Sequence, residues 1–207
     1  MIHDEKSTRK PLSGRVKAQR ERILTAAQDC FVKHGFHAAS MASIAETAGM
    51  SAGLIYRYFP NKSAIVLAII ERQTEIELED MRQFSAATDP TEALVETFAA
   101  WSRPEPGMRI MNAALFLEAS AEATRDEAVA KAMQQVDELY YHELQSLMAR
   151  PAAQGGFGMP AETARRRSLV LLCLVEGLAV RATRDPGLDL DWLRAALGEV
   201  MPHLVGK

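Results

Sequence analysis

Residues 40–62 read S-M-A-S-I-A-E-T-A-G-M-S-A-G-L-I-Y-R-Y-F-P-N-K, and this stretch predicts two short helices separated at a glycine. Ser40 and Ser51 each precede a helical pattern, where a serine oxygen accepts the unpaired N–H groups of the first turn. Gly49 lies between the two patterns, and glycine adopts the left-handed backbone that ends a helix without steric cost. The pattern is typical of a helix-turn-helix, whose second helix reads the major groove of DNA. A plain helical hairpin within a bundle fits the same pattern.

A longer segment around this stretch resembles the N-terminal signature of the TetR family of bacterial transcriptional regulators. It covers residues 35–65 and reads G-F-H-A-A-S-M-A-S-I-A-E-T-A-G-M-S-A-G-L-I-Y-R-Y-F-P-N-K-S-A-I. The matching positions are Gly35, Phe36, Ser40, Ile44, Ala45, Ala48, Gly49, Ser51, Gly53, Tyr56, Phe59 and Lys62. The motif resemblance extends over residues 16–70. It implies an all-α homodimer that binds a palindromic operator on double-stranded DNA and is released by a small-molecule effector.

The resemblance also implies a domain organisation with about nine helices. We expect a flexible tail over residues 1–14, a three-helix helix-turn-helix DNA-binding domain over 15–61, and a helical ligand-binding and dimerisation domain over 62–207. In the last domain, the penultimate helix has more consecutive apolar residues than a single buried helix face requires. With the last helix it is expected to form a four-helix interface across a two-fold axis, as in the family.

Helical periodicity and capping residues place the individual helices. The first helix runs from Arg15 to about His34 and ends at Gly35. Asn61 and Asp89 are expected to cap the next two long helices, and Thr124 has capping-box spacing to Glu127. The predicted helices after the motif are residues 62–86, 90 to before 104, 107–123, 124–150, 161–184 and 189–204.

Charge is distributed unevenly along the chain. Residues 1–62 contain ten basic and five acidic side chains, a charge of +5, whereas the remainder carries −8, giving the net −3 of the whole chain. Because DNA is a polyanion, this change of sign favours a DNA-binding N-terminal end.

Several function classes lack support in the sequence. No apolar run approaches the ~18 residues that span a bilayer, and the N-terminus lacks a signal-peptide core, so we expect a cytoplasmic protein without membrane contact. The two cysteines, Cys30 and Cys173, lie in apolar helical stretches and are predicted to be buried free thiols. Metal-ligand spacing and a nucleophile constellation are both missing, so we expect no metal, no cofactor and no enzyme activity.

The resemblance allows candidate DNA contacts to be assigned position by position. Hydroxyl groups and helix N-terminal amides suit phosphates, and Arg57 suits a guanine or a phosphate. The candidates are Ser40, Ser51, Ala52, Gly53, Leu54, Tyr56, Arg57, Tyr58 and Lys62. Of these, Lys62 is expected to hold a phosphate; Arg15, Lys17 and Arg20 could also reach phosphates. A solvated helix face is the alternative for Arg57 and Tyr58.

Two positions depart from the family pattern. Ala52 stands where many relatives have lysine, and Leu54 where many have a polar residue. The second helix is therefore poor in groups that hydrogen-bond to bases. Leu54 could contact a thymine methyl group or be buried, which leaves specificity to Tyr56, Arg57 and operator shape.

Met and aromatic residues are frequent between residues 62 and 150, as suits an adaptable apolar pocket and equally an ordinary core. The candidate pocket residues are Phe84, Phe98, Trp101, Met111, Glu118, Tyr140 and Glu143. Buried acids would favour a cationic effector, whereas Arg181 would favour an anionic one. A ligand-responsive repressor is the leading interpretation. The alternatives are a ligand-independent architectural or nucleoid-associated DNA-binding protein and an enzyme that uses the helical pocket.

Overall fold

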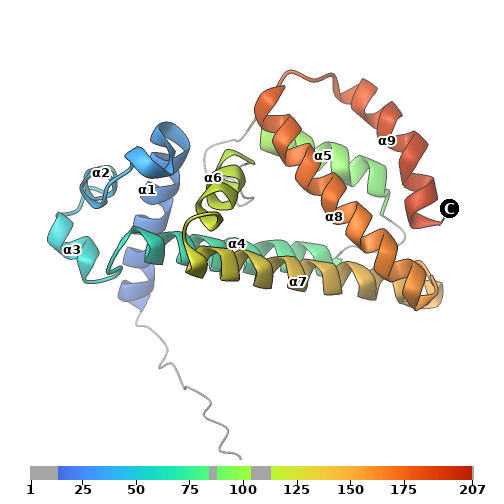
Figure 1. The fold of residues 1–207 in the computed structure, drawn as a ribbon, viewed down its shortest axis with the longest axis horizontal. Helices are drawn as coiled ribbons and strands as arrows, with labels where there is room; N and C mark the ends of the chain where they lie inside the picture. The colour runs from blue at the N-terminus through green and yellow to red at the C-terminus, as the bar shows by residue number, and fades with distance from the viewer. Residues whose placement is uncertain (1–13, 84–87, 104–112, 207) are drawn as a thin grey trace, which may run out of the picture. The chain divides into compact units, whose positions relative to one another are not determined.

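The computed structural model describes residues 14–83, 88–103 and 113–206 (Figure 1). Within these ranges every regular element is helical: nine α-helices and one short 3₁₀ turn, which confirms the predicted all-α class. The chain divides into two compact units between Ile65 and Val66. None of the helices in these ranges is long and apolar enough to cross a membrane.

The N-terminal unit is built on a single long helix. Its elements are α1 (Gly14–Ala38), α2 (Met41–Thr47), α3 (Ala52–Tyr56) and the first turn of α4 (Lys62–Gln83). Gly35 interrupts α1 with a positive φ of 76°, so the predicted break is confirmed, although a further helical turn follows it. The predicted tail lies outside the described residues except for Gly14.

The core of this unit follows the helical spacing of the sequence. Apolar residues recur along α1 on the face that packs against α2, and α3 adds one fully buried side chain. Removing a large aliphatic or aromatic side chain from water stabilises a fold by about 1.5–3 kcal/mol. The side chains with at most 2% exposure are Ile23, Ala27, Phe31, Ile44, Ile55, Phe59 and Ile65.

Helix α4 starts as predicted and continues into the second unit. The Oδ1 of Asn61 accepts a hydrogen bond from the N–H of Ala64 at 2.8 Å, which satisfies one unpaired donor of the first turn. The predicted boundary at residue 62 lies within this first turn, and the predicted end over residues 84–86 lies outside the described residues.

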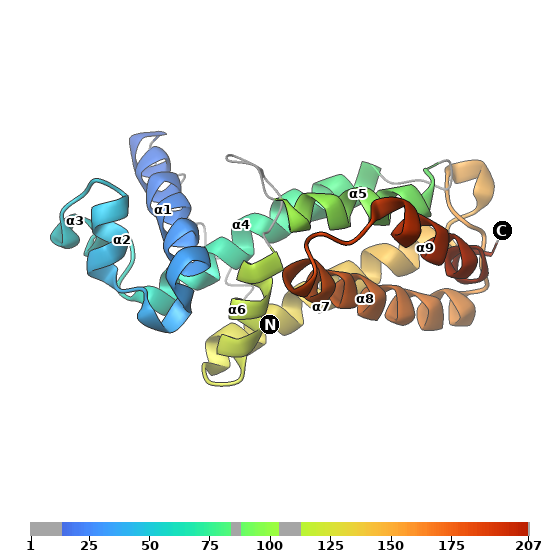
Figure 2. The ribbon, with the colours of Figure 1, turned by 90° about the horizontal axis from the view of Figure 1, so that it is seen from above.

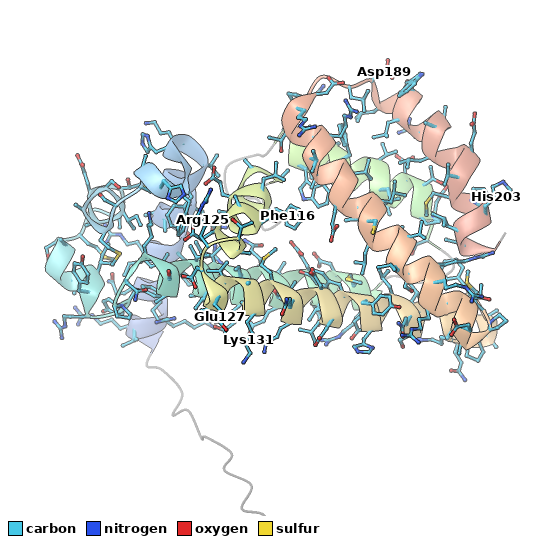
Figure 3. All side chains as sticks on the ribbon, in the orientation of Figure 1. Phe116, Arg125, Glu127, Lys131, Asp189 and His203 are labelled. Carbon is cyan, nitrogen blue, oxygen red and sulfur yellow. The ribbon has the colours of Figure 1, made fainter. Side chains whose placement is uncertain are left out.

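The C-terminal unit contains the rest of α4 and five further α-helices. They are α5 (Pro90–Ser102), α6 (Ala113–Ala123), α7 (Glu127–Ala149), α8 (Ala161–Arg184) and α9 (Leu190–Val205), with a 3₁₀ turn at Ala152–Gln154. Helices α5, α8 and α9 lie together in both views (Figures 1 and 2) and share one apolar core. Phe98 is fully buried in this core, and the labelled Phe116 of α6 packs against it (Figure 3).

Aspartates cap three helices of the C-terminal unit. Asp89 accepts from the N–H of Thr91 at 2.9 Å, as predicted. Asp189, labelled at the start of α9 in Figure 3, caps that helix in the same way. The prediction that Thr124 opens α7 is wrong, because Asp126 caps it and the Thr124 hydroxyl donates to Ala121 at the end of α6.

The two cysteines differ in their surroundings. Cys30 is buried in the N-terminal unit, and its Sγ lies 3.2 Å from the hydroxyl of Thr47. Cys173 is exposed on α8, so the prediction of two buried thiols is wrong for this residue. It lies beside the exposed side chains of Leu169 and Val170, one turn earlier on the same helix.

Candidate nucleic-acid interface and effector interior

A reciprocal capping box fixes the start of α2. The Ser43 N–H donates to the Oγ of Ser40 at 3.1 Å, and the Ser40 N–H donates to the Oγ of Ser43 at 2.9 Å. Two unpaired backbone donors are thereby satisfied by side chains three residues apart. Ser40 is therefore an N-cap, as its sequence position predicted, and remains exposed.

The turn between α2 and α3 depends on Gly49. Its φ of +59° lies in the left-handed region that favours glycine. The Nη2 of Arg22, on α1, donates to the Gly49 carbonyl oxygen at 3.3 Å. A β-carbon at Gly49 would lie 2.8 Å from that Nη2, so the end of the Arg22 side chain would have to move, and the positive φ is what selects glycine here.

Helix α3 is short and held by one buried residue. Ile55 is fully buried, whereas Tyr56 is 55% exposed and Leu54 is half-buried. Ser51 occupies the N-cap position but makes no side-chain capping bond, so its hydroxyl is not used as the sequence predicted. The buried Ile55 fixes the helix, and the exposed Tyr56 is free of the core.

The first turn of α3 has small side chains, so its backbone is accessible from outside. Ser51, Ala52 and Gly53 are all exposed. A β-carbon at Gly53 would meet nothing within 4 Å inside the protein. Packing therefore does not require glycine at this position, and the predicted close approach of DNA to Gly53 stays a prediction.

The segment after α3 is fastened to α1. The Nη1 of Arg20 donates to the carbonyl oxygen of Tyr58 at 3.2 Å, and the guanidinium carbon lies 4.3 Å from the centroid of the Phe59 ring. A guanidinium over an aromatic face gains electrostatic attraction in addition to packing. Arg20 is thus engaged inside the unit, unlike the phosphate-contacting role that its sequence position allows.

Lys62 makes a similar internal contact at the start of α4. Its Nζ donates to the carbonyl oxygens of Ala39, at 3.0 Å, and of Phe36. The ammonium nitrogen also lies 4.3 Å from the centroid of the Phe36 ring. In this structure the ammonium group contacts protein carbonyls and an aromatic ring, and the phosphate contact of Lys62 stays a prediction.

The candidate DNA contacts thus fall into two groups. Exposed backbone and side chains gather on α3 and the residue that ends it, while Ser40 and Lys62 are used for capping and fastening. The exposed group consists of Ser51, Ala52, Gly53, Tyr56 and Arg57. Tyr58 is half-buried, and its carbonyl is held by Arg20. The sequence did not predict these internal contacts of Arg20 and Lys62, because each cation and its carbonyl partner are more than 20 positions apart in the chain.

Polar groups also meet inside the C-terminal unit. The Tyr140 hydroxyl of α7 donates to the Glu77 carboxylate of α4. Burial, the charge of Glu77 and this hydrogen bond all raise the pKa of Tyr140 above its ordinary value. Asp137 lies one turn before Tyr140 on α7, and its charge contributes to the same effect. The phenol is therefore held neutral, as a donor to Glu77.

Two further carboxyls lie near this hydrogen bond. Desolvation raises the pKa of Asp137, and desolvation together with the charge of Asp137 raises the pKa of Glu176 on α8. Both side chains are exposed, and the partial burial of their carboxyls disfavours the charged form. Asp137 and Glu176 therefore repel each other across the packed helices α7 and α8.

Within the described residues, the buried polar atoms of this unit without a hydrogen-bond partner include one on each of three helices. These three are Oε1 of Gln73 on α4, Nε1 of Trp101 on α5 and Oε2 of Glu122 on α6. Gln73 is only 3% exposed and lies one turn before Glu77 on the same helix. A buried polar group left unpaired costs about 1–3 kcal/mol, so each such atom calls for an explanation.

The predicted pocket residues are placed in different surroundings. Phe98 belongs to the apolar core, and Glu143 lies 3.5 Å from the guanidinium of Arg82. Trp101 and Glu118 are half-buried, and the Tyr140 hydroxyl donates a hydrogen bond to Glu77. Phe84 and Met111 lie outside the described residues. The sequence pattern did not identify Gln73, Asp137 or Glu77, since each is a common surface type on an amphipathic helix.

Comparison with known proteins decides the family. The family described as bacterial regulatory proteins of the tetR family matches residues 23–69. The HTH-type transcriptional regulator UidR of Escherichia coli K12 is 32% identical over 186 residues, which cover 88% of this chain and 92% of UidR. The chain belongs to the TetR family. It is therefore related to DNA-binding transcriptional regulators and not to enzymes.

Solved structures agree with the fold. Salmonella enterica GusR superposes with a TM-score of 0.70 at 27% identity, covering 92% of this chain and 96% of GusR. A putative transcriptional regulator from Saccharomonospora viridis, solved in complex with choline, has a TM-score of 0.68 at 22% identity, over 90% of this chain and 97% of that one. At this lower identity the likeness concerns the fold alone.

Proposed function

We propose that this TetR-family protein is a ligand-responsive repressor, which binds a palindromic operator as a homodimer and leaves it when a small molecule binds the C-terminal unit. The exposed face of α3, with Tyr56, Arg57 and the uncrowded Gly53, would read each half-site. The positive N-terminal residues favour this end of the chain for DNA, since its excess of basic side chains attracts phosphates.

The unpaired polar atoms inside the C-terminal unit support a ligand most strongly. Gln73, on the face of α4 that also presents Glu77, is nearly completely buried with its carbonyl oxygen unsatisfied. A fold that served only as a scaffold would be more stable with apolar residues at such positions. A polar effector that donates hydrogen bonds would explain why they are retained.

An apolar surface on α8 and α9 supports the homodimer. Large hydrophobic side chains are exposed on both helices, and Trp192 of α9 is 67% exposed. Exposed apolar groups that cluster on neighbouring helices are typical of subunit interfaces. The exposed apolar residues of these helices include Leu169, Val170 and Cys173 of α8 and Trp192 and Val200 of α9. A homodimer would present one α3 helix to each of the two half-sites of a palindromic operator.

A thermal-shift screen of small metabolites tests the ligand response. A true effector should raise the unfolding temperature, since a ligand that binds only the folded state stabilises it. The same compound should release a labelled operator duplex in a fluorescence-anisotropy titration. Both effects are expected to weaken in Gln73→Leu, which removes the buried carbonyl oxygen that lacks a partner. They should persist in Glu75→Gln, a control at an exposed position of the same helix.

The outcome separates repressor from architectural protein. Compounds that stabilise the protein yet leave the DNA complex intact would argue for ligand binding without regulation. A protein that binds DNA tightly and responds to no compound would fit the ligand-independent alternative. In neither case would the assignment to a DNA-binding family change.

A further inference from the structure

Lys62 lies at the junction of three segments of the N-terminal unit. It is the first residue of α4, and its ammonium group reaches back to the connection between α1 and α2. There it donates to the carbonyl oxygens of Phe36 and Ala39 and lies against the Phe36 ring. Lys62 is half-buried by these contacts. A single cation thus joins the start of α4 to the segment that leads into the helix-turn-helix.

The two carbonyl oxygens need a partner of this kind. Phe36 follows the break at Gly35 and lies in the last turn of α1, where carbonyl oxygens find no N–H donor within the helix. Ala39 immediately precedes Ser40, the N-cap of α2. A positive charge near the C-terminal end of a helix is favourable, because the carbonyl ends carry partial negative charge. Lys62 therefore fixes the direction in which the chain enters α2.

Arg20 makes the same kind of contacts after α3, at the other end of the helix-turn-helix. Each cation lies 4.3 Å from a phenylalanine ring, Arg20 over Phe59 and Lys62 over Phe36. Each also donates to a carbonyl of the connecting backbone, at Tyr58 for Arg20. The two cations hold the chain before α2 and after α3, so the pair of helices is fastened at both ends.

We infer that Lys62 is a positioning residue, which supports DNA binding by holding the α1–α2 connection and not by contacting a phosphate. This inference rests on the DNA-binding function of the family. A phosphate contact would require the ammonium group to give up its two carbonyl partners and the aromatic face. A residue that only positions α2 and α3 raises the affinity for DNA but neutralises no phosphate itself.

Salt dependence separates these two roles. Each phosphate neutralised by a cation contributes about 0.9 to the slope of log affinity against log salt concentration on duplex DNA. Loss of a direct contact therefore lowers the slope by about 0.9, whereas loss of a positioning group leaves the slope unchanged and lowers affinity at every salt concentration. Arg57 is exposed at the end of α3 and serves as the comparison for a direct contact.

The experiment uses the full chain and a duplex of about 30 base pairs, selected by the wild-type protein from a random-sequence library. Fluorescence anisotropy gives the affinity between about 50 and 200 mM KCl, well below the unfolding temperature. We expect Lys62→Met to lose about tenfold or more in affinity with the wild-type slope, and Arg57→Met to lower the slope. Should Lys62→Met not fold, Lys62→Gln, which is also uncharged but keeps an amide donor, gives the same readout.

A second measurement does not depend on DNA. Hydrogen exchange in the free protein should become faster at the amides of residues 38–45 in Lys62→Met, and remain unchanged there in Arg57→Met. A slope that falls by about 0.9 in Lys62→Met would overturn the inference in favour of a phosphate contact. Unchanged affinity in the folded variant, or unchanged exchange, would also overturn it. Failure of the wild-type protein to select any duplex would instead contradict DNA reading, and exchange would still decide whether Lys62 fastens the connection.

Discussion

The guanidinium carbon of Arg20 lies 4.3 Å from the centroid of the Phe59 ring, and its Nη1 donates to the carbonyl oxygen of the preceding residue, Tyr58. Helix α1 thereby holds the chain where it leaves α3. The relationship joins residues 38 positions apart at the Arg20–Tyr58 bond. A basic side chain of α1 is thereby engaged in contacts within the unit.

Replacing Arg20 with Met should destabilise the N-terminal unit. The variant keeps a long side chain but loses the hydrogen bond and the cation–π contact, so we expect a loss of about 1–2 kcal/mol. Native-state hydrogen exchange at the amides of α1 and α3 measures this free energy locally. Lys17→Met, at an exposed position of the same helix, is the control and should change little. Equal protection in both variants would contradict the fastening role.

Replacing Gly49 with Ala should also destabilise this unit. An L-residue at φ +59° costs about 1–2 kcal/mol, and the new β-carbon would displace Arg22 from the Gly49 carbonyl. The same hydrogen-exchange measurement applies. In an Arg22→Met background the substitution should cost less, because the close contact at 2.8 Å is no longer present. An identical cost in both backgrounds would show that Arg22 plays no part.

Gly53→Ala should have the opposite effect on the fold. Nothing lies within 4 Å of the added β-carbon, and alanine is favoured over glycine in a helix by up to about 1 kcal/mol. The free energy of unfolding should stay the same or rise. If DNA backbone approaches this turn closely, affinity for the selected duplex should nevertheless fall by about tenfold or more. Retained affinity would place the DNA away from Gly53.

Tyr56→Ala should separate binding from folding. Because Tyr56 is 55% exposed, we expect the free energy of unfolding to change by no more than about 0.5 kcal/mol. Affinity for the duplex should fall by about 10- to 100-fold, as for loss of a specific contact. Tyr56→Phe shows how much of that loss belongs to the hydroxyl. Val32→Ala, at an exposed apolar residue of α1, should leave affinity unchanged.

Asp137→Asn should change how stability depends on pH. Desolvation raises the pKa of Asp137 in the folded protein, so the folded state binds its proton more tightly than the unfolded state. Wild-type stability therefore falls as pH rises from the ordinary Asp value of 3.8 through the raised folded pKa. The variant lacks this loss. It should be more stable than wild type at about pH 7.5 and lose that advantage at about pH 4. An equal difference in unfolding temperature between variant and wild type at both pH values would contradict this.

Local interactions were the most predictable part of the molecule. Ser40, Asn61 and Asp89 each cap a helix through atoms two or three residues away, so a short window of sequence contains both partners. The left-handed conformation of Gly49 was predictable for the same reason. Thr124 was the exception, since Thr124 and Asp126 both offer an oxygen before the same helix and only the structure shows which one reaches the amides.

The candidate sites were less predictable because their partners are distant in sequence. Lys62 and Phe36 are 26 positions apart, and Tyr140 and Glu77 are 63 apart. A lysine at the start of a helix has the same sequence pattern whether it meets a phosphate or a carbonyl. Gln73 likewise has the pattern of a surface residue, and only its burial shows that its carbonyl oxygen lies inside the fold.

Sequence-specific reading of DNA by α3 is the central claim, and a competition measurement tests it most directly. The wild-type protein is bound to the selected duplex of about 30 base pairs, and then challenged with the same duplex or with a scrambled duplex of equal length and composition, at one salt concentration. We predict that the scrambled duplex competes about 1,000-fold or more weakly, and that Tyr56→Ala narrows this ratio. Equal competition by both duplexes would contradict a sequence-reading regulator and favour an architectural protein that binds DNA through its backbone alone.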